Sequence, residues 1–196
     1  TLMMDEDLLE EVNYIVEYPT AFYGEFEKSY LSLPKEAIIT PMKEHQRYFP
    51  VLDEDGKLLN KFITVRNGDS YAIDNVKRGN EKVLDARLSD ALFFYHEDTK
   101  KPLEAYVERL DTIVFQQKLG TILDKTKRIQ NLSEKIAKAL ALTLPNLDRA
   151  AYLSKADLTT AMVFEFTELQ GIMGRYYANL SNEPSEVAEA IYEHYL

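Results

Sequence analysis

The sequence contains no cysteine and only three histidines among its 196 residues. Without cysteine, the chain has no disulfide, no reactive thiolate and no zinc site with thiolate ligands, and it fits a reducing compartment. The histidines, His45, His96 and His194, lie far apart, and no two are spaced for one helix face. The sequence therefore predicts no metal site.

Several catalytic motifs are also missing. The chain has no G-x-S-x-G, no P-loop and no G-x-G-x-x-G, which argues against a serine triad and against a built-in nucleotide cradle. Carboxylates are plentiful, but pairs such as Glu165 with Glu168 and Asp85 with Asp90 are typical of solvated faces or ion-pair partners. We predict no catalytic residue and no cofactor for this chain.

Long hydrophobic runs are absent as well. No run approaches the roughly 20 residues that span a bilayer, and no charged-then-apolar leader opens the chain. We therefore expect a soluble, cytoplasmic chain with no membrane partner. The formal net charge of -10 argues against a protein that coats nucleic acid indiscriminately, because counterion release needs clustered cations. No DNA partner is expected.

The first 70 residues mix helical and strand patterns. Residues 5–16 place apolar side chains at helical spacing behind an acidic first turn. A second helix is expected to begin at Ser32 or Leu33, with a kink or break at Pro41. Asp55 and Gly56 lie between two apolar runs, 48–52 and 58–66, and this pattern predicts an antiparallel hairpin. Residues 20–30 are placed only as a connection that contains a half-turn of helix.

From residue 71 to the end, helical patterns have no competing strand signal. A long helix is expected over 73–96, and one beginning at Thr121 is expected to bury an apolar stripe beside a solvated, Lys-rich face. The stripe consists of Ile122, Ile129, Leu132, Ile136 and Leu140. The predicted fold class is therefore α+β: a small module with an antiparallel hairpin and helices over 1–70, then an all-helical bundle over 71–196. Because the chain opens at Thr1 and stops inside an unfinished helical pattern, we expect a piece of a longer protein.

Two polar residues interrupt the apolar stripe of the long helix. Stepping about 100° per residue places Asn80 and Arg87 in the middle of the stripe. A buried guanidinium costs several kcal/mol unless it is paired. We assign both residues to an internal polar network at the junction of the two modules, and an open functional cleft is the alternative.

Cations gather around the 43–50 segment, which joins Lys43, His45 and Arg47 to two aromatic residues just before a strand. Such a segment offers donors and stacking faces that suit phosphate or base contacts. The alternatives are an ordinary turn with two core aromatics, and cations neutralised by neighbouring acids. The candidates for an RNA-binding patch are Lys43, His45, Arg47, Arg66, Lys77 and Arg78.

Seven stretches of the chain resemble the beta subunit of the bacterial two-subunit glycyl-tRNA synthetase. They are VEYPTAFYGEF, LPKEAIITPMKEHQRYFPV, GKLLNKFITVRNGD, NVKRGNEKVLDARLSDALFFYHEDTKKPLE, FQQKLGT, KADLTTAMVFEFTELQGIMGRYYA and VAEAIYEHYL. The resemblance implies a central fragment of that subunit, with the alpha subunit and tRNA(Gly) as partners. It also implies that ATP and magnesium belong to the alpha subunit, and that the helical module is similar to the HD phosphohydrolase fold.

Two other interpretations are open. A metal-dependent HD-type phosphohydrolase would use the same bundle, but the chain has no His-Asp dipeptide and few histidines. A purely structural subunit contact would place the RNA surface elsewhere in the longer protein. Metal analysis tests the first alternative, and separate binding to tRNA and to the alpha subunit tests the second.

Overall fold

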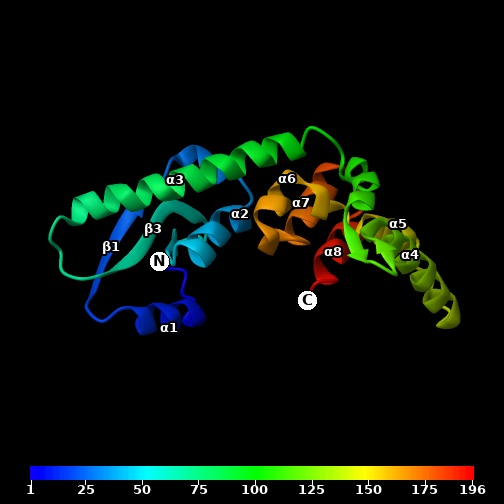
Figure 1. Ribbon diagram of the computed structural model, residues 1–196, viewed down its shortest axis with the longest axis horizontal. Helices are drawn as coiled ribbons and strands as arrows, with labels where there is room; N and C mark the ends of the chain where they lie inside the picture. Colours follow the sequence, from blue (N-terminus) through cyan, green and yellow to red (C-terminus); the bar gives the residue numbers. More distant parts are fainter. The chain divides into compact units, whose positions relative to one another are not determined.

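The computed structural model describes all 196 residues and divides them into two units, Thr1–Phe93 and Phe94–Leu196 (Figure 1). The sequence had predicted a boundary near Ser70. The structure places it later because most of helix α3 (Ile73–Asp98) belongs to the first unit. Two of its acidic residues hold it there. Glu81 accepts a hydrogen bond of 2.9 Å from the Glu25 amide, and Asp85 accepts one of 2.9 Å from the Tyr30 hydroxyl.

An antiparallel sheet of three strands, in the order β1-β3-β2, forms the centre of the first unit. The predicted hairpin is confirmed as β2 (Phe49–Leu52) and β3 (Leu58–Asn67), and Gly56 in their turn has a φ of +79°. The connection expected over residues 20–30 is wrong for residues 20–25, because β1 spans Pro19–Glu25 and pairs with β3 along its whole length. The half-turn of helix expected in the same region is present as a 3-10 turn. Pro19 is tolerated because it is the first residue of an edge strand.

Helix α1 (Glu6–Ile15) packs its apolar side against one face of this sheet. Leu8 and Val12 form a buried cluster with Phe49, and Ile63 and Val65 of β3 pack against it. Asp5 caps the helix, since its carboxylate accepts a hydrogen bond of 3.0 Å from the Leu8 amide. Ile63 and Val65 of β3 thus lie on the face of the sheet that α1 covers.

Gly24 allows the buried ring of Phe62 to lie directly against β1. A methyl group at position 24 would lie 2.3 Å from the Phe62 Cζ. The Phe62 ring is fully buried and stacks on Tyr48 at 4.4 Å and 11°. Because neither ring has room to move, the glycine is required by packing.

We expect Gly24→Ala to destabilise the first unit by about 1–3 kcal/mol, the usual cost of forcing extra atoms into a packed core. Urea unfolding of the two proteins measures the difference. Gly79→Ala is a matched control, since nothing lies within 4 Å of its added methyl; in a helix interior alanine is favoured by about 1 kcal/mol. A Gly24→Ala protein as stable as the original would contradict the argument.

A kink or break was expected at Pro41 in the second helical segment of the first unit, but the helix changes type there without a break. After the 3-10 turn η1 (Lys28–Ser32), α2 covers Lys35–Thr40 and continues as one turn of π-helix, η2 (Pro41–His45). Proline has no amide hydrogen for the α-helical ladder, so the hydrogen-bonding pattern changes there.

The second unit is built from short helices around a core of fully buried side chains, Leu103, Leu110, Leu153, Met162, Leu169, Met173 and Ile191. Its α-helices are α4 (Ile122–Ala139), α5 (Leu147–Leu153), α6 (Ala161–Glu165), α7 (Ile172–Leu180) and α8 (Ser185–Glu193). Its 3-10 turns are η3 (Leu103–Tyr106), η4 (Glu108–Thr112), η5 (Ala156–Thr159) and η6 (Thr167–Leu169). It is not purely helical as predicted, because β4 (Val114–Gln116) and β5 (Gly120–Thr121) form a short hairpin. The overall α+β class is confirmed.

Candidate functional site

The aromatic rings of the 43–50 segment belong to the core. Tyr48 is 4% exposed and stacks on Phe62, and Phe49 is 3% exposed within the cluster below α1. Burial raises the pKa of the Tyr48 hydroxyl to about 12. The interpretation of these rings as stacking faces for bases is therefore wrong, and the alternative of two core aromatics is confirmed.

The cations of the same segment pair with acids of the first helical region. Lys43 forms an ion pair with Asp5, and this hydrogen bond lowers the pKa of the Asp5 carboxyl. Arg47 contacts Glu11 through Nε and Nη2, each at 2.8 Å. His45 lies exposed on η2. Two of the three predicted RNA contacts thus fasten α1 to the segment.

The other three predicted contacts are also engaged locally. Arg66 donates a hydrogen bond of 2.6 Å to the Tyr71 carbonyl oxygen, and Arg78 bonds to the Asn75 side chain. Lys77 lies 4.2 Å from the centre of the Tyr23 ring and 3.8 Å from the Glu81 carboxylate. These contacts lie outside the 43–50 segment, so they give no support to a single joint patch.

Asn80 and Arg87 are half-buried on α3. Their assignment to a polar network at the junction stays a prediction. Glu81 and Asp85 hold α3 to β1 and η1 through hydrogen bonds, whereas the sequence had suggested a solvated face or an ion-pair partner for Asp85. The sequence around a carboxylate on a helix does not indicate which distant amide or hydroxyl donates a hydrogen bond to it.

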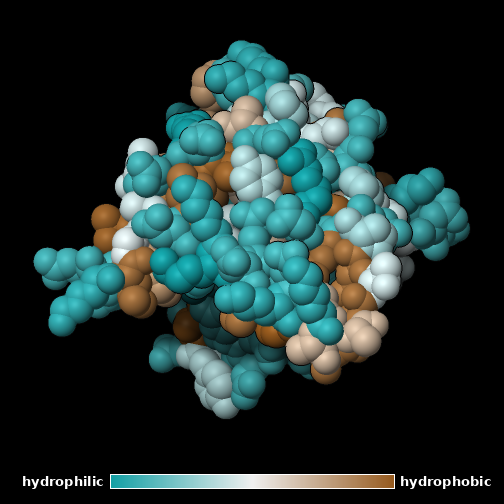
Figure 2. All heavy atoms as spheres, turned by 90° about the vertical axis from the view of Figure 1, so that its right-hand side faces the viewer, coloured by the Kyte–Doolittle hydropathy of each residue, from teal (hydrophilic) through white to brown (hydrophobic).

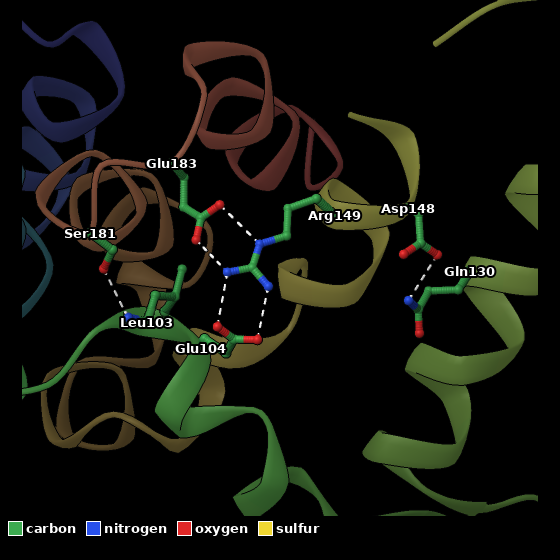
Figure 3. Close-up of polar contacts among 7 residues, drawn as sticks. All are labelled: Leu103, Glu104, Gln130, Asp148, Arg149, Ser181 and Glu183. Atoms are coloured by element: carbon green, nitrogen blue, oxygen red, sulfur yellow. Dashed lines mark hydrogen bonds and ion pairs between the residues drawn. The ribbon is translucent and has the colours of Figure 1, made fainter. Parts of the chain in front are cut away.

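Arg149 of α5 joins three parts of the second unit (Figure 3). Its Nε and Nη2 donate to Glu183 at 3.0 and 2.6 Å, and its Nη1 and Nη2 donate to Glu104 at 2.9 and 3.1 Å. Both carboxylates raise the pKa of the Arg149 guanidinium, Glu183 most, and Arg149 lowers the pKa of Glu104. This bidentate arrangement binds η3 and the segment between α7 and α8 to α5.

Asp98 is a buried carboxylate at the end of α3, with three donors aimed at it. It accepts hydrogen bonds of 2.8 Å from the Ala161 amide, 2.9 Å from the Met162 amide and 3.0 Å from the Tyr177 hydroxyl. The two amides belong to the first turn of α6. Asp98 is therefore a structural cap that positions α6 and α7.

A second buried carboxylate, Asp157, lies beside α7 and the end of the chain. It accepts a hydrogen bond of 2.6 Å from the Gly171 amide, and its Oδ1 and the Tyr195 hydroxyl are both buried without a partner. Burial raises the pKa of Asp157 to about 6, although the amides of Gly171 and Gly174 and the charge of Lys155 oppose the rise. Burial lowers the pKa of Lys155 to about 8, and its Nζ lies 2.7 Å from Nε2 of His194.

Asp157 is expected to make the stability of the second unit depend on pH. Its pKa in the folded chain, about 6, lies above the reference value of 3.8, so folding favours the protonated form. The contribution is complete below about pH 4 and is lost as the pH rises through about 6. The difference between the two values corresponds to roughly 3 kcal/mol.

The measurement compares the original chain with Asp157→Asn by urea unfolding at about pH 4 and about pH 8. The stability difference between the two proteins should change by roughly 3 kcal/mol between these conditions. Asp55→Asn, in the exposed turn of the hairpin, serves as a control with a constant difference. A constant difference for Asp157→Asn as well would show that its pKa is ordinary.

Helix α4 exposes much of the apolar stripe that the sequence had predicted to be buried. Its buried positions are Thr126 and Ala137, and Gln130 between them donates a hydrogen bond of 3.0 Å to Asp148 of α5. The large apolar residues Leu132, Ile136 and Leu140 are instead exposed, by 58%, 49% and 63%. These three residues, spaced four apart along α4 and its C-cap, form what we call the apolar ridge. Leu142 and Leu144 are also about half exposed, but they line a separate pocket beside Ala137. Figure 2, which views the side where α4 lies, shows hydrophobic side chains in brown among hydrophilic ones.

Two kinds of feature are absent from the structure. No group of three or more His, Cys, Asp or Glu side chains is arranged to hold a metal ion. No helix has the length and apolar character needed to cross a membrane.

Comparison with known proteins identifies the chain. Residues 1–196 match the family described as glycyl-tRNA synthetase beta subunit. The glycine–tRNA ligase beta subunit of Clostridioides difficile is 68% identical over 194 residues, which are 98% of this chain and 28% of that protein. Those of Bacillus subtilis and Moorella thermoacetica are 56% identical over 199 residues and 55% over 194, covering 100% and 97% of this chain.

The chain is thus related to subunits of aminoacyl-tRNA ligases, and it spans 28% to 29% of the length of these three relatives. It belongs to the glycyl-tRNA synthetase beta subunit family.

Proposed function

We propose that the chain is part of the beta subunit of a cytoplasmic, two-subunit glycyl-tRNA synthetase, and that it contributes to tRNA binding and to subunit assembly. In this proposal the alpha subunit holds ATP and magnesium and activates glycine. The observation that carries the proposal is the family match over all 196 residues. The structural roles of Arg149 and Asp98, whose polar atoms are used within the fold, agree with a scaffold.

The apolar ridge supports the assembly part of the proposal. Monomeric soluble proteins rarely expose large contiguous apolar patches. Burying such surface lowers the free energy by about 25 cal/mol per Å². Leu132, Ile136 and Leu140 follow one side of α4 and its C-cap, with side chains that are 49% to 63% exposed. A protein surface within the complete synthetase is the suitable cover.

The test uses the complete beta subunit mixed with the alpha subunit. Leu132→Asp with Ile136→Asp should weaken assembly, measured by sedimentation, and lower the rate of glycyl-tRNA formation. Leu180→Asp, at another exposed leucine at the end of α7, should leave both unchanged. Full assembly and activity of the double variant would contradict the assembly role, and an alpha subunit that forms glycyl-tRNA equally well without any beta subunit would contradict the whole proposal.

A further inference from the structure

Helix α4 is strongly basic within an acidic chain. It carries five cations, Lys125, Lys127, Arg128, Lys135 and Lys138, against the two carboxylates of Asp124 and Glu134. The chain as a whole has a formal net charge of -10. The positive charge of α4 is therefore concentrated locally.

Four exposed polar side chains of α4 surround a shallow pocket of about 290 Å³. Lys127, Arg128, Asn131 and Lys135 line it together with Leu132. Residues four apart on a helix are neighbours, so Lys127, Asn131 and Lys135 follow one line along α4, and Arg128 lies beside it. From Lys127 to Lys135 the helix rises about 12 Å. We call these four residues the basic face of α4.

The cations of the basic face have no carboxylate within ion-pair distance, unlike Lys43 and Arg47. Lys127 and Arg128 help to lower the pKa of Asp124, but the hydrogen bonds of Asp124 to Thr121 contribute first. That carboxylate is used in the capping box at the start of α4. Glu134 pairs with Lys138 at 2.8 Å. The charges of Lys127, Arg128 and Lys135 are thus available to an anionic partner.

We propose that the basic face of α4 contacts the sugar-phosphate backbone of tRNA. This inference rests on the proposed function and names the surface that the tRNA-binding part requires. Cationic side chains and a side-chain amide can donate hydrogen bonds to phosphate and ribose oxygens. The pocket has no aromatic side chain on which a base could stack, so the contact positions the RNA without reading its sequence.

The experiment reverses the three charges in the complete beta subunit and measures the assembled two-subunit enzyme. For Lys127→Glu, Arg128→Glu and Lys135→Glu together, the affinity for tRNA should fall at least tenfold, and the salt dependence of binding should weaken by about two to three units of slope. Glycine-dependent ATP–pyrophosphate exchange should not change. Lys138→Glu is the control on the same helix, because Lys138 is already paired with Glu134; its affinity for tRNA should change much less.

A milder triple variant, with glutamine at the same three positions, guards against a folding defect and should show a smaller loss in the same direction. Unchanged affinity and salt slope in both triple variants would overturn the inference while leaving the proposed function intact. Loss of alpha-subunit binding with normal tRNA affinity would also overturn it and would identify an acidic protein surface as the partner. Failure of the proposed function would differ, because tRNA affinity of the original enzyme would then be independent of the beta subunit.

Discussion

Replacing Asp98 by alanine is expected to destabilise the second unit by about 3–5 kcal/mol. The substitution leaves the Ala161 and Met162 amides and the Tyr177 hydroxyl without an acceptor in a buried environment. Each unsatisfied buried donor costs about 1–3 kcal/mol. Because whole proteins have net stabilities of only about 5–15 kcal/mol, the loss is large.

Chemical unfolding of the chain, followed with a probe in the second unit, measures this loss. Asp98→Asn keeps one acceptor oxygen and should be intermediate, while Tyr177→Phe removes one bond and should cost about 1 kcal/mol. The double variant Asp98→Ala with Tyr177→Phe should lose less than the sum of the single variants, because they share a hydrogen bond. A loss below about 1 kcal/mol for Asp98→Ala would show that water satisfies these donors and that the cap is dispensable.

Replacing Arg149 by alanine is expected to cost about 2–4 kcal/mol. The full penalty for breaking a buried ion pair is about 3–5 kcal/mol, and it is reduced here because the Arg149 side chain is 33% exposed and that of Glu104 is 52% exposed. Most of the effect should come from Glu183, whose side chain is only 11% exposed and would keep a poorly solvated charge. Unfolding experiments with the second unit provide the measurement.

Two controls separate geometry from charge at Arg149. Arg149→Lys keeps the charge but loses the bidentate fork, so it should lose a large part of the same stability. Lys138→Ala breaks the exposed pair with Glu134 and should change stability by no more than about 0.5 kcal/mol. Equal effects of Lys138→Ala and Arg149→Ala would contradict the structural role assigned to Arg149.

Local sequence patterns predicted the elements whose side chains alternate or repeat without interruption. The hairpin of β2 and β3 and the long helix α3 are of this kind. Strand β1 was missed because Pro19 and Gly24 weaken its pattern. Both residues fit for tertiary reasons, since Pro19 begins an edge strand and Gly24 accommodates Phe62. Residues 19–25 form a strand because they pair with β3, which is distant in the sequence.

Sequence reasoning located the cations of the candidate site but not their partners. Lys43 and Arg47 meet acids of the first helical region that lie more than 30 positions earlier. The predicted orientation of α4 was also wrong, because the residues that pack against this helix are not visible in its own sequence pattern. The sequence favoured burying its largest apolar residues, but the buried residues of α4 are the small Thr126 and Ala137. The observed orientation of α4 leaves both the apolar ridge and the basic face exposed on this helix.

The orientation of α4 affects how soluble the chain is by itself. The large aliphatic side chains Leu132, Ile136 and Leu140 remain in water, and contact between copies would release that water. Salts that strengthen apolar association, such as sulfate, should therefore promote reversible clustering and precipitation. Aspartate substitutions along this edge of the helix would improve solubility without touching the interior.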